Sequence, residues 1–223
     1  MAEQLSPTRE DYLKVIYELG GRVTRVPNKE ISKKLSISPP TVTEMMSTLV
    51  GIGWIDYIPY KGSMLTETGV EEAKKLIHKH RLWEVFLVEH LGYNLEEVHD
   101  EAEILEHSTS DTLANKLYHF LGKPDYCPHG GAISFNKIEE QDNEAIPLSE
   151  AKMGTKIKIL RHVNEEKLLV YFKNHNLNLL DVIIVKEFDK ALDLLHIYNE
   201  TNGEDVYISE KTSHYIFVAK VDE

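Results

Sequence analysis

Apolar residues recur at the spacing of an α-helix in the first part of the chain. They stand at positions 12, 13, 16, 17 and 19, after Ser6-Pro7-Thr8 and before Gly20-Gly21, which predicts a helix that glycine ends. A short helix over 29–35, capped by Asn28, and a longer helix after Pro39-Pro40 follow. Residues 54–58 then alternate as a strand before a turn at 60–63. This order predicts a winged helix-turn-helix domain, which we place at residues 1–75.

Two further blocks follow. Apolar positions at helical spacing from 73 to 87 and between 99 and 121 predict an all-α domain over residues 76–141, whose apolar stripes also predict a homodimer interface. Residues 136–147 read as a polar, acidic linker. Short strands at 156–160, 183–188, 194–198, 206–208 and 216–221, with one helix near 165–175, predict a small SH3-like β-barrel over residues 147–223. We therefore expect an α+β fold class.

The helix after Pro39-Pro40 is the expected recognition helix, which enters the major groove of duplex DNA by its N-terminal end. The residues expected to contact DNA are small or polar on its outward side, or are lysines placed for phosphates. They are Lys29, Lys33, Lys34, Ser38, Pro40, Thr41, Thr43, Glu44 and Lys61. The alternative is a winged helix that binds another protein.

Net charge limits how such a domain can bind DNA. Residues 1–75 hold ten Lys/Arg and ten Asp/Glu, so the remaining 148 residues carry the whole formal charge of −12. An acidic protein binds nucleic acid poorly without local basic residues or bound cations. No apolar run reaches the ~20 residues of a membrane helix, the N-terminus resembles no signal peptide, and the one cysteine suits a reducing compartment. We expect a soluble, cytoplasmic protein with no membrane partner.

Carboxylate and imidazole side chains gather in three segments. In the segment 99–107, Glu103, Glu106 and His107 stand at i, i+3 and i+4, so a helix would present all three on one face. His80 and Glu84 have the same spacing on another expected helix, and Cys127-Pro128-His129 places a thiol beside an imidazole. The alternative is a set of solvated acidic faces and a buried cysteine. Because the clusters lie close together in sequence, the pattern favours a transition-metal site.

These motifs together resemble the diphtheria toxin repressor family over essentially the whole chain, and most of all its manganese-responsive branch. The matching segments are EDYLKVIYEL at 10–19, ISPPTVTEMM at 37–46, KHRLWEVFL at 79–87, HDEAEILEH at 99–107 and CPHGG at 127–131. The resemblance implies a metal-activated, homodimeric repressor of metal-uptake genes that binds double-stranded operator DNA. It implies one site made by Asp11, Glu103, Glu106 and His107, and a second made by His80, Glu84, Cys127 and His129.

The resemblance also bears on the metal. Iron-responsive members have methionine at the position of Asp11 and cysteine at that of Glu103, and carboxylate oxygens suit the harder Mn²⁺. Cys127 favours softer ions, so Fe²⁺, Zn²⁺ and Co²⁺ are expected to bind in vitro. Relatives offer a carboxylate near Asn164, where this chain has an amide or the neighbouring Glu165, and His99 is expected to support a ligand rather than to bind metal itself.

Two other functions remain as alternatives. One is an iron-responsive repressor of the same family. The other is a helical metalloenzyme, which would need an open coordination position and a general base. The sequence holds no H-E-x-x-H motif and no nucleophile motif. We therefore expect a protein that is not an enzyme, with no catalytic residues and no small-molecule substrate.

Overall fold

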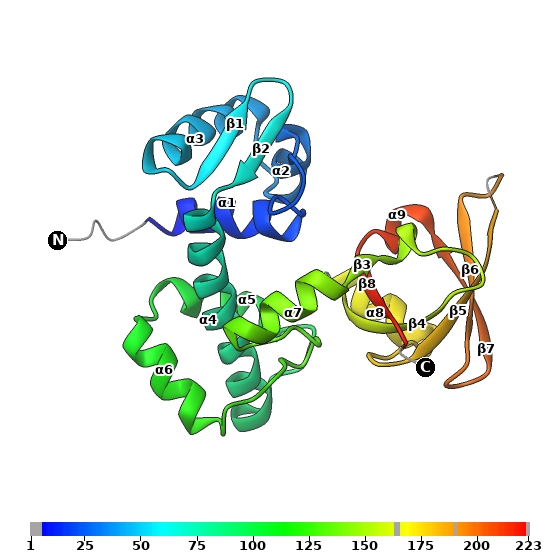
Figure 1. The fold of residues 1–223 in the computed structure, drawn as a ribbon. Helices are drawn as coiled ribbons and strands as arrows, with labels where there is room; N and C mark the ends of the chain where they lie inside the picture. The colour runs from blue at the N-terminus through cyan, green and yellow to red at the C-terminus, as the bar shows by residue number, and fades with distance from the viewer. Residues whose placement is uncertain (1–5, 163–165, 190, 222–223) are drawn as a thin grey trace. The chain divides into compact units, whose positions relative to one another are not determined.

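The computed structural model describes residues 6–162, 166–189 and 191–221 (Figure 1). The chain forms two compact units, one made of 1–80 and 103–114, the other of 81–102 and 115–223. Three helices contribute residues to both units: α4 (Glu67–Leu91), α5 (Val98–His107) and α6 (Asp111–Phe120). The domain boundaries expected from the sequence stay predictions.

The first unit contains the expected winged helix-turn-helix, which the structure confirms. Its elements are α1 (Pro7–Glu18), α2 (Asn28–Lys34), α3 (Pro39–Ile52), β1 (Ile55–Ile58) and β2 (Gly62–Leu65). The local sequence explains the bounds of α3. Ser38 precedes the two prolines, and its side chain accepts a hydrogen bond from the backbone amide of Thr41. At the other end, Gly53 follows the last turn and adopts the left-handed conformation (φ 86°).

One apolar side of each of these helices forms the core of the DNA-binding domain. Ile16, Ile31, Val42, Met46 and Leu49 are fully buried. Three of these residues lie on α3 at helical spacing, so a single face of that helix is committed to packing. Burial of each large side chain contributes about 1.5–3 kcal/mol. The opposite face of α3 is left to solvent.

The β1–β2 hairpin is held close to the segment before α2. The amide of Val26 donates to the carbonyl of Ser63 at 2.7 Å, and the amide of Ser63 returns a bond to Val26 at 3.0 Å. Gly62 lies at φ 99°, and a Cβ there would stand 2.2 Å from the Val26 carbonyl oxygen. Only glycine therefore allows this approach. The hairpin tip carries Tyr60 and Lys61, both exposed to solvent.

The prediction of a linker over residues 136–147 is wrong for most of that range, because the helix α7 (Phe135–Glu144) occupies it. Ile138 and Gln141, three residues apart, share the buried face of this helix. The Gln141 amide oxygen accepts from the Ala132 amide at 3.0 Å, and its nitrogen donates to the Gly130 carbonyl at 2.8 Å. Hydrogen bonds from a polar side chain therefore fix α7 against the loop at Gly130 and Ala132, and a pattern of apolar residues could not predict them.

The C-terminal region is the expected small β-domain. One antiparallel sheet has the strand order β3-β8-β4-β5-β6-β7, and two register shifts, at 159–161 and 185–187, are the kind of irregularity that bends a sheet. Fully buried residues such as Ile159, Ile183, Ile197 and Val218 fill its core. The strands are β3 (Ile146–Pro147), β4 (Lys156–His162), β5 (Val182–Asp189), β6 (Leu194–Asn199), β7 (Glu204–Ser209) and β8 (Ile216–Lys220).

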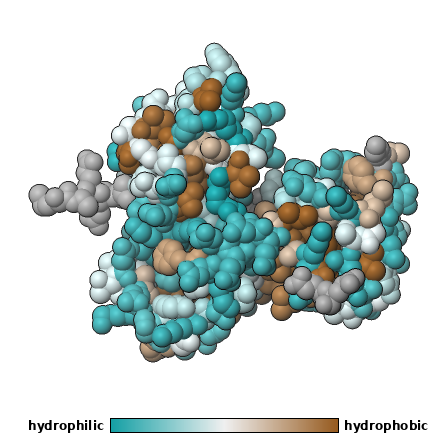
Figure 2. Space-filling view, viewed as in Figure 1, coloured by the Kyte–Doolittle hydropathy of each residue, from teal (hydrophilic) through white to brown (hydrophobic). Residues whose placement is uncertain are grey.

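Three short elements of this region were not expected: β3, the 3-10 turn η1 (Leu148–Glu150) and α9 (Glu210–Ser213). The expected helix is α8 (Glu166–Asn174). Asn164 and Glu165, considered as metal ligands, lie outside the described residues. Within the described ranges, no helix has both the length and the apolar character needed to cross a membrane. Figure 2 shows scattered apolar residues among hydrophilic ones on the viewed face.

Candidate metal centre

Four of the expected ligands come together in the first unit. Asp11 lies on α1, and Glu103, Glu106 and His107 lie on one face of α5. Each offers a ligand atom, and these four atoms all lie within 4.8 Å of one another. We call these residues the α1–α5 cluster. Three carboxylates and an imidazole are a donor set that fits a divalent first-row metal with a preference for oxygen.

His107 holds a proton tightly in this arrangement. Its Nε2 atom lies 2.9 Å from Oδ1 of Asp11, and its Nδ1 atom lies 2.6 Å from Oε2 of Glu10. The hydrogen bond with Asp11, and then that with Glu10, raises the pKa of His107 to about 10. Because a metal binds the deprotonated nitrogen, metal binding here must release this proton.

Glu106 is the most buried member, with 0% of its surface exposed. Its oxygens accept hydrogen bonds from the ammonium of Lys14 at 2.8 and 3.0 Å, and Oε2 lies 2.6 Å from Nδ1 of His80. Lys14 also donates to Oε2 of Glu103 at 2.6 Å. Burial lowers the pKa of the Lys14 ammonium, but Glu106 and Glu103 more than compensate, so its pKa is raised and the lysine stays charged.

A second group lies wholly within the second unit. Glu84 on α4, Cys127 and His129 are all buried, and one ligand atom of each lies within 4.8 Å of the other two. Nδ1 of His129 lies 2.9 Å from Oε1 of Glu84. Burial, and then the charge of Glu84, raises the pKa of the Cys127 thiol well above its usual range. A thiol, an imidazole and a carboxylate fit a softer ion such as Zn²⁺ or Fe²⁺ once the thiol is deprotonated.

Gly130 makes the loop of this group possible. The Cys127 amide donates to the Gly131 carbonyl at 2.8 Å, and the Gly130 amide donates to the Cys127 carbonyl at 2.9 Å. Gly130 lies at φ 78°, and a Cβ there would stand 2.5 Å from the carbonyl oxygen of Leu160. The tight turn therefore presents Cys127 and His129 to the same side as Glu84.

His80, assigned to the second site by the resemblance, lies against Glu106 and Lys14 in the first unit. That His80 binds metal in the same site as Glu84 stays a prediction, as does the supporting role of His99. Sequence reasoning missed Glu10 and Lys14, which contact the expected ligands directly. A signal was present, because Lys14 follows Asp11 by three residues and therefore leaves α1 on the same side.

Most of the expected DNA-contacting residues are exposed to solvent on the winged helix domain. Ser38, Pro40, Thr41, Thr43 and Glu44 are exposed on or just before α3. The Thr43 hydroxyl donates to the Pro39 carbonyl at 3.1 Å and accepts from the Asn28 amide nitrogen at 3.2 Å. The lysines of this set are Lys29, Lys33 and Lys61, which are exposed, and Lys34, which is half-buried.

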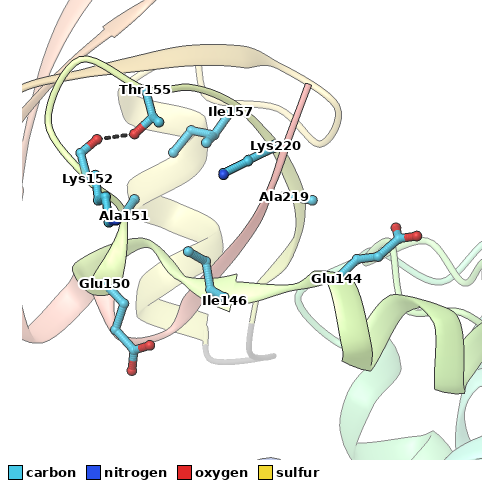
Figure 3. A pocket seen from close by; sticks show the side chains of 9 residues that line it. All are labelled: Glu144, Ile146, Glu150, Ala151, Lys152, Thr155, Ile157, Ala219 and Lys220. Carbon is cyan, nitrogen blue, oxygen red and sulfur yellow. Dashed lines mark hydrogen bonds between the residues drawn. The ribbon is translucent and has the colours of Figure 1, made fainter. Parts of the chain in front are cut away.

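A cavity of about 380 Å³ opens in the C-terminal domain (Figure 3). Its lining combines two lysines and two glutamates with small and apolar residues: Glu144, Ile146, Glu150, Ala151, Lys152, Thr155, Ile157, Ala219 and Lys220. The Thr155 hydroxyl donates to the Lys152 carbonyl at its rim.

Two family models match this chain. Residues 4–63 match the "Iron dependent repressor, N-terminal DNA binding domain", and residues 66–134 match the "Iron dependent repressor, metal binding and dimerisation domain". An uncharacterized HTH-type transcriptional regulator of Methanocaldococcus jannaschii is 41% identical over 120 residues, which cover 53% of this chain and 96% of that protein.

Two further relatives extend over the whole length. The diphtheria toxin repressor of Corynebacterium glutamicum is 27% identical over 230 residues, with 99% of each chain covered. The solved structure of the manganese regulator SloR aligns with a TM-score of 0.80 and 33% identity, over 97% of this chain and 100% of that one. The chain belongs to the iron-dependent repressor family, whose members include the diphtheria toxin repressor.

Proposed function

We propose that this chain is a homodimeric, cytoplasmic transcriptional repressor of genes for metal-ion uptake. It binds operator DNA when a divalent metal is bound, and it responds most strongly to Mn²⁺. The observation that carries the proposal is the α1–α5 cluster. It joins Asp11, from the first helix of the DNA-binding domain, to three residues of a helix within the matched dimerisation domain.

The physical basis of the switch lies in the charge of this cluster. Asp11, Glu103 and Glu106 converge on a single small volume, where the Lys14 ammonium and the protonated His107 offset only part of their three negative charges. A bound divalent cation would displace the His107 proton and supply the remaining positive charge. Asp11 then holds α1, and with it the recognition helix α3, in a fixed position relative to α5. By linkage, DNA must tighten metal binding by the same factor as metal tightens DNA binding.

Donor chemistry and similarity both support Mn²⁺ as the main effector. The α1–α5 cluster offers oxygen from three of its four residues, and hard cations such as Mn²⁺ favour carboxylate oxygen. The manganese regulator SloR is similar over nearly the whole chain. An iron-responsive repressor is the second candidate, because Cys127 adds a soft ligand to the group of Glu84 and His129. Zn²⁺ and Co²⁺ are expected to bind the same groups in vitro.

The DNA contacts divide into two kinds. Thr41, Thr43 and Glu44 on α3 face base edges, while Pro40 offers an apolar surface to a thymine methyl group. The exposed lysines of α2 and Lys61 at the hairpin tip contact phosphates, so binding weakens as salt concentration rises. Tyr60, beside Lys61 at the hairpin tip, is fully exposed, and we expect it to contact the sugar-phosphate backbone of DNA as well.

The test is DNA binding with each metal in turn. Duplexes are first selected from a random library by the wild-type protein with Mn²⁺, and affinity is then measured with Mn²⁺, Fe²⁺, Zn²⁺, Co²⁺ or a chelator under reducing, anaerobic conditions. We expect tight binding with Mn²⁺ and a loss of at least tenfold, or about 1.4 kcal/mol, with chelator. Equal affinity with and without metal would refute the proposal, and a stronger response to Fe²⁺ would favour the iron sensor.

A further inference from the structure

Lys14 is a buried cation inside the metal cluster itself. It lies on α1, one turn after Asp11, and only 4% of its surface is exposed. Lysine is almost never buried to this degree unless its ammonium is paired with negative charge. The position of Lys14 therefore depends on the groups that surround its nitrogen.

Those groups form a nearly complete cation site. Nζ lies 2.6 Å from Oε2 of Glu103, 2.8 and 3.0 Å from the two oxygens of Glu106, and 3.2 Å from Nδ1 of His80. The contacts come from three helices, α1, α4 and α5. Two carboxylates and an imidazole are also the donors that a transition metal takes in a helical protein.

Glu103 and Glu106 serve two cation positions at once. On one side they belong to the α1–α5 cluster with Asp11 and His107, and on the other they hold the Lys14 ammonium. With the lysine included, the three carboxylates carry a net charge of about −2, which one divalent ion cancels. Without the lysine, the same carboxylates would retain an uncancelled charge after one ion had bound.

We propose that the ammonium of Lys14 is a tethered cation that occupies the side of the cluster facing His80, and that it limits the cluster to a single metal ion. Neutral substitutions at Lys14 therefore open a second metal position formed by His80, Glu103 and Glu106. This inference rests on the proposed role of the cluster as a metal site. It makes Lys14 the residue that determines how many ions the α1–α5 cluster binds.

The test counts Mn²⁺ bound to the full-length protein after equilibrium dialysis. Lys14→Met and Lys14→Gln remove the charge with little loss of length, and Lys14→Arg keeps the charge. Lys75→Met is the matched control, because Lys75 pairs with the single carboxylate of Glu72 outside the cluster. We expect the two neutral variants to bind about one more Mn²⁺ per protomer than the wild type, and the other two variants to match it.

Electron paramagnetic resonance provides a second readout, and its wild-type arm does not depend on the folding of any variant. Two Mn²⁺ ions that share Glu103 and Glu106 couple magnetically, whereas single ions do not. We expect uncoupled signals from the saturated wild type and a coupled signal from each neutral variant that folds. A coupled pair in the wild type, or no gain in a folded neutral variant, would overturn the inference. If instead the joint replacement of Glu103, Glu106 and His107 by alanine leaves the wild-type Mn²⁺ count unchanged, it is the metal-site assignment that fails.

Discussion

Replacing Asp11 by alanine should separate metal binding from DNA binding. Asp11 is the sole member of the α1–α5 cluster that lies on α1, so the substitution leaves Glu103, Glu106 and His107 on α5. An ion can still bind to these three side chains, but it no longer joins α1 to α5. Measured couplings between two ligands of one protein lie at about 1–3 kcal/mol. We therefore expect metal-dependent operator affinity to fall by about tenfold or more, that is, about 1.4 kcal/mol or above.

A smaller effect works in the opposite direction. Without the Asp11 carboxylate 2.9 Å from Nε2, the pKa of His107 falls and the imidazole gives up its proton to metal more easily. Glu10 limits this gain, because it still contacts the other ring nitrogen at 2.6 Å. The substitution also removes the negative charge of the Asp11 carboxylate, which attracts the metal cation. Loss of the link between the helices should therefore dominate.

The assay is fluorescence anisotropy of a labelled, selected duplex, titrated with protein at saturating Mn²⁺ and again with chelator. Glu71→Ala is the control, because it removes one exposed carboxylate from α4 outside the cluster. Glu71→Ala should behave as the wild type. If Asp11→Ala keeps its Mn²⁺ response while Glu84→Ala loses it, the switch lies in the group of Glu84, Cys127 and His129 instead.

Three further perturbations test the fold and the assembly. Met46→Ala, in the fully buried core of the winged helix domain, should lower the free energy of unfolding in urea by about 2–5 kcal/mol, and an unchanged midpoint would contradict that core. Burial raises the pKa of Tyr171 to about 12 from its ordinary 10. The neutral phenol therefore stabilises the fold fully below pH 10, and this stabilisation is lost as pH rises through 12, which lowers the melting temperature. Tyr171→Phe should reduce this alkaline fall in melting temperature. Phe120 is 67% exposed beside the rings of Phe86 and His90, so Phe120→Glu should weaken the dimer by about tenfold in sedimentation. The wild-type dimer should persist in chelator, and a monomer under those conditions would contradict an apolar interface.

Local periodicity was sufficient to predict the winged helix domain. The apolar positions of α3 recur at helical spacing, and its prolines and Gly53 mark the two ends. The grouping of Glu103, Glu106 and His107 follows from the same local geometry, because i, i+3 and i+4 share one helix face. The strands of the C-terminal sheet were also recognisable from their apolar runs.

Contacts between distant segments were not visible in that pattern. Asp11 joins α5 across more than ninety residues, and its place in the cluster was implied only by the family resemblance. Lys14 read as an ordinary polar position of α1, although its ammonium is buried between Glu103 and Glu106. The helix α7 was missed because its packing depends on the amide of Gln141, which hydrogen-bonds to the backbone of Gly130 and Ala132 rather than forming an apolar stripe.

Metal bound at the α1–α5 cluster should be coupled to DNA binding, and thermodynamic reciprocity makes this coupling measurable from either ligand. The affinity of the wild-type protein for Mn²⁺ is measured by calorimetry with and without saturating operator duplex, and the ratio is compared with the effect of Mn²⁺ on DNA affinity. The two factors should be equal and at least about tenfold. In Asp11→Ala, both factors should fall together toward unity. Mn²⁺ affinity that does not change when operator is added to the wild-type protein would contradict this coupling.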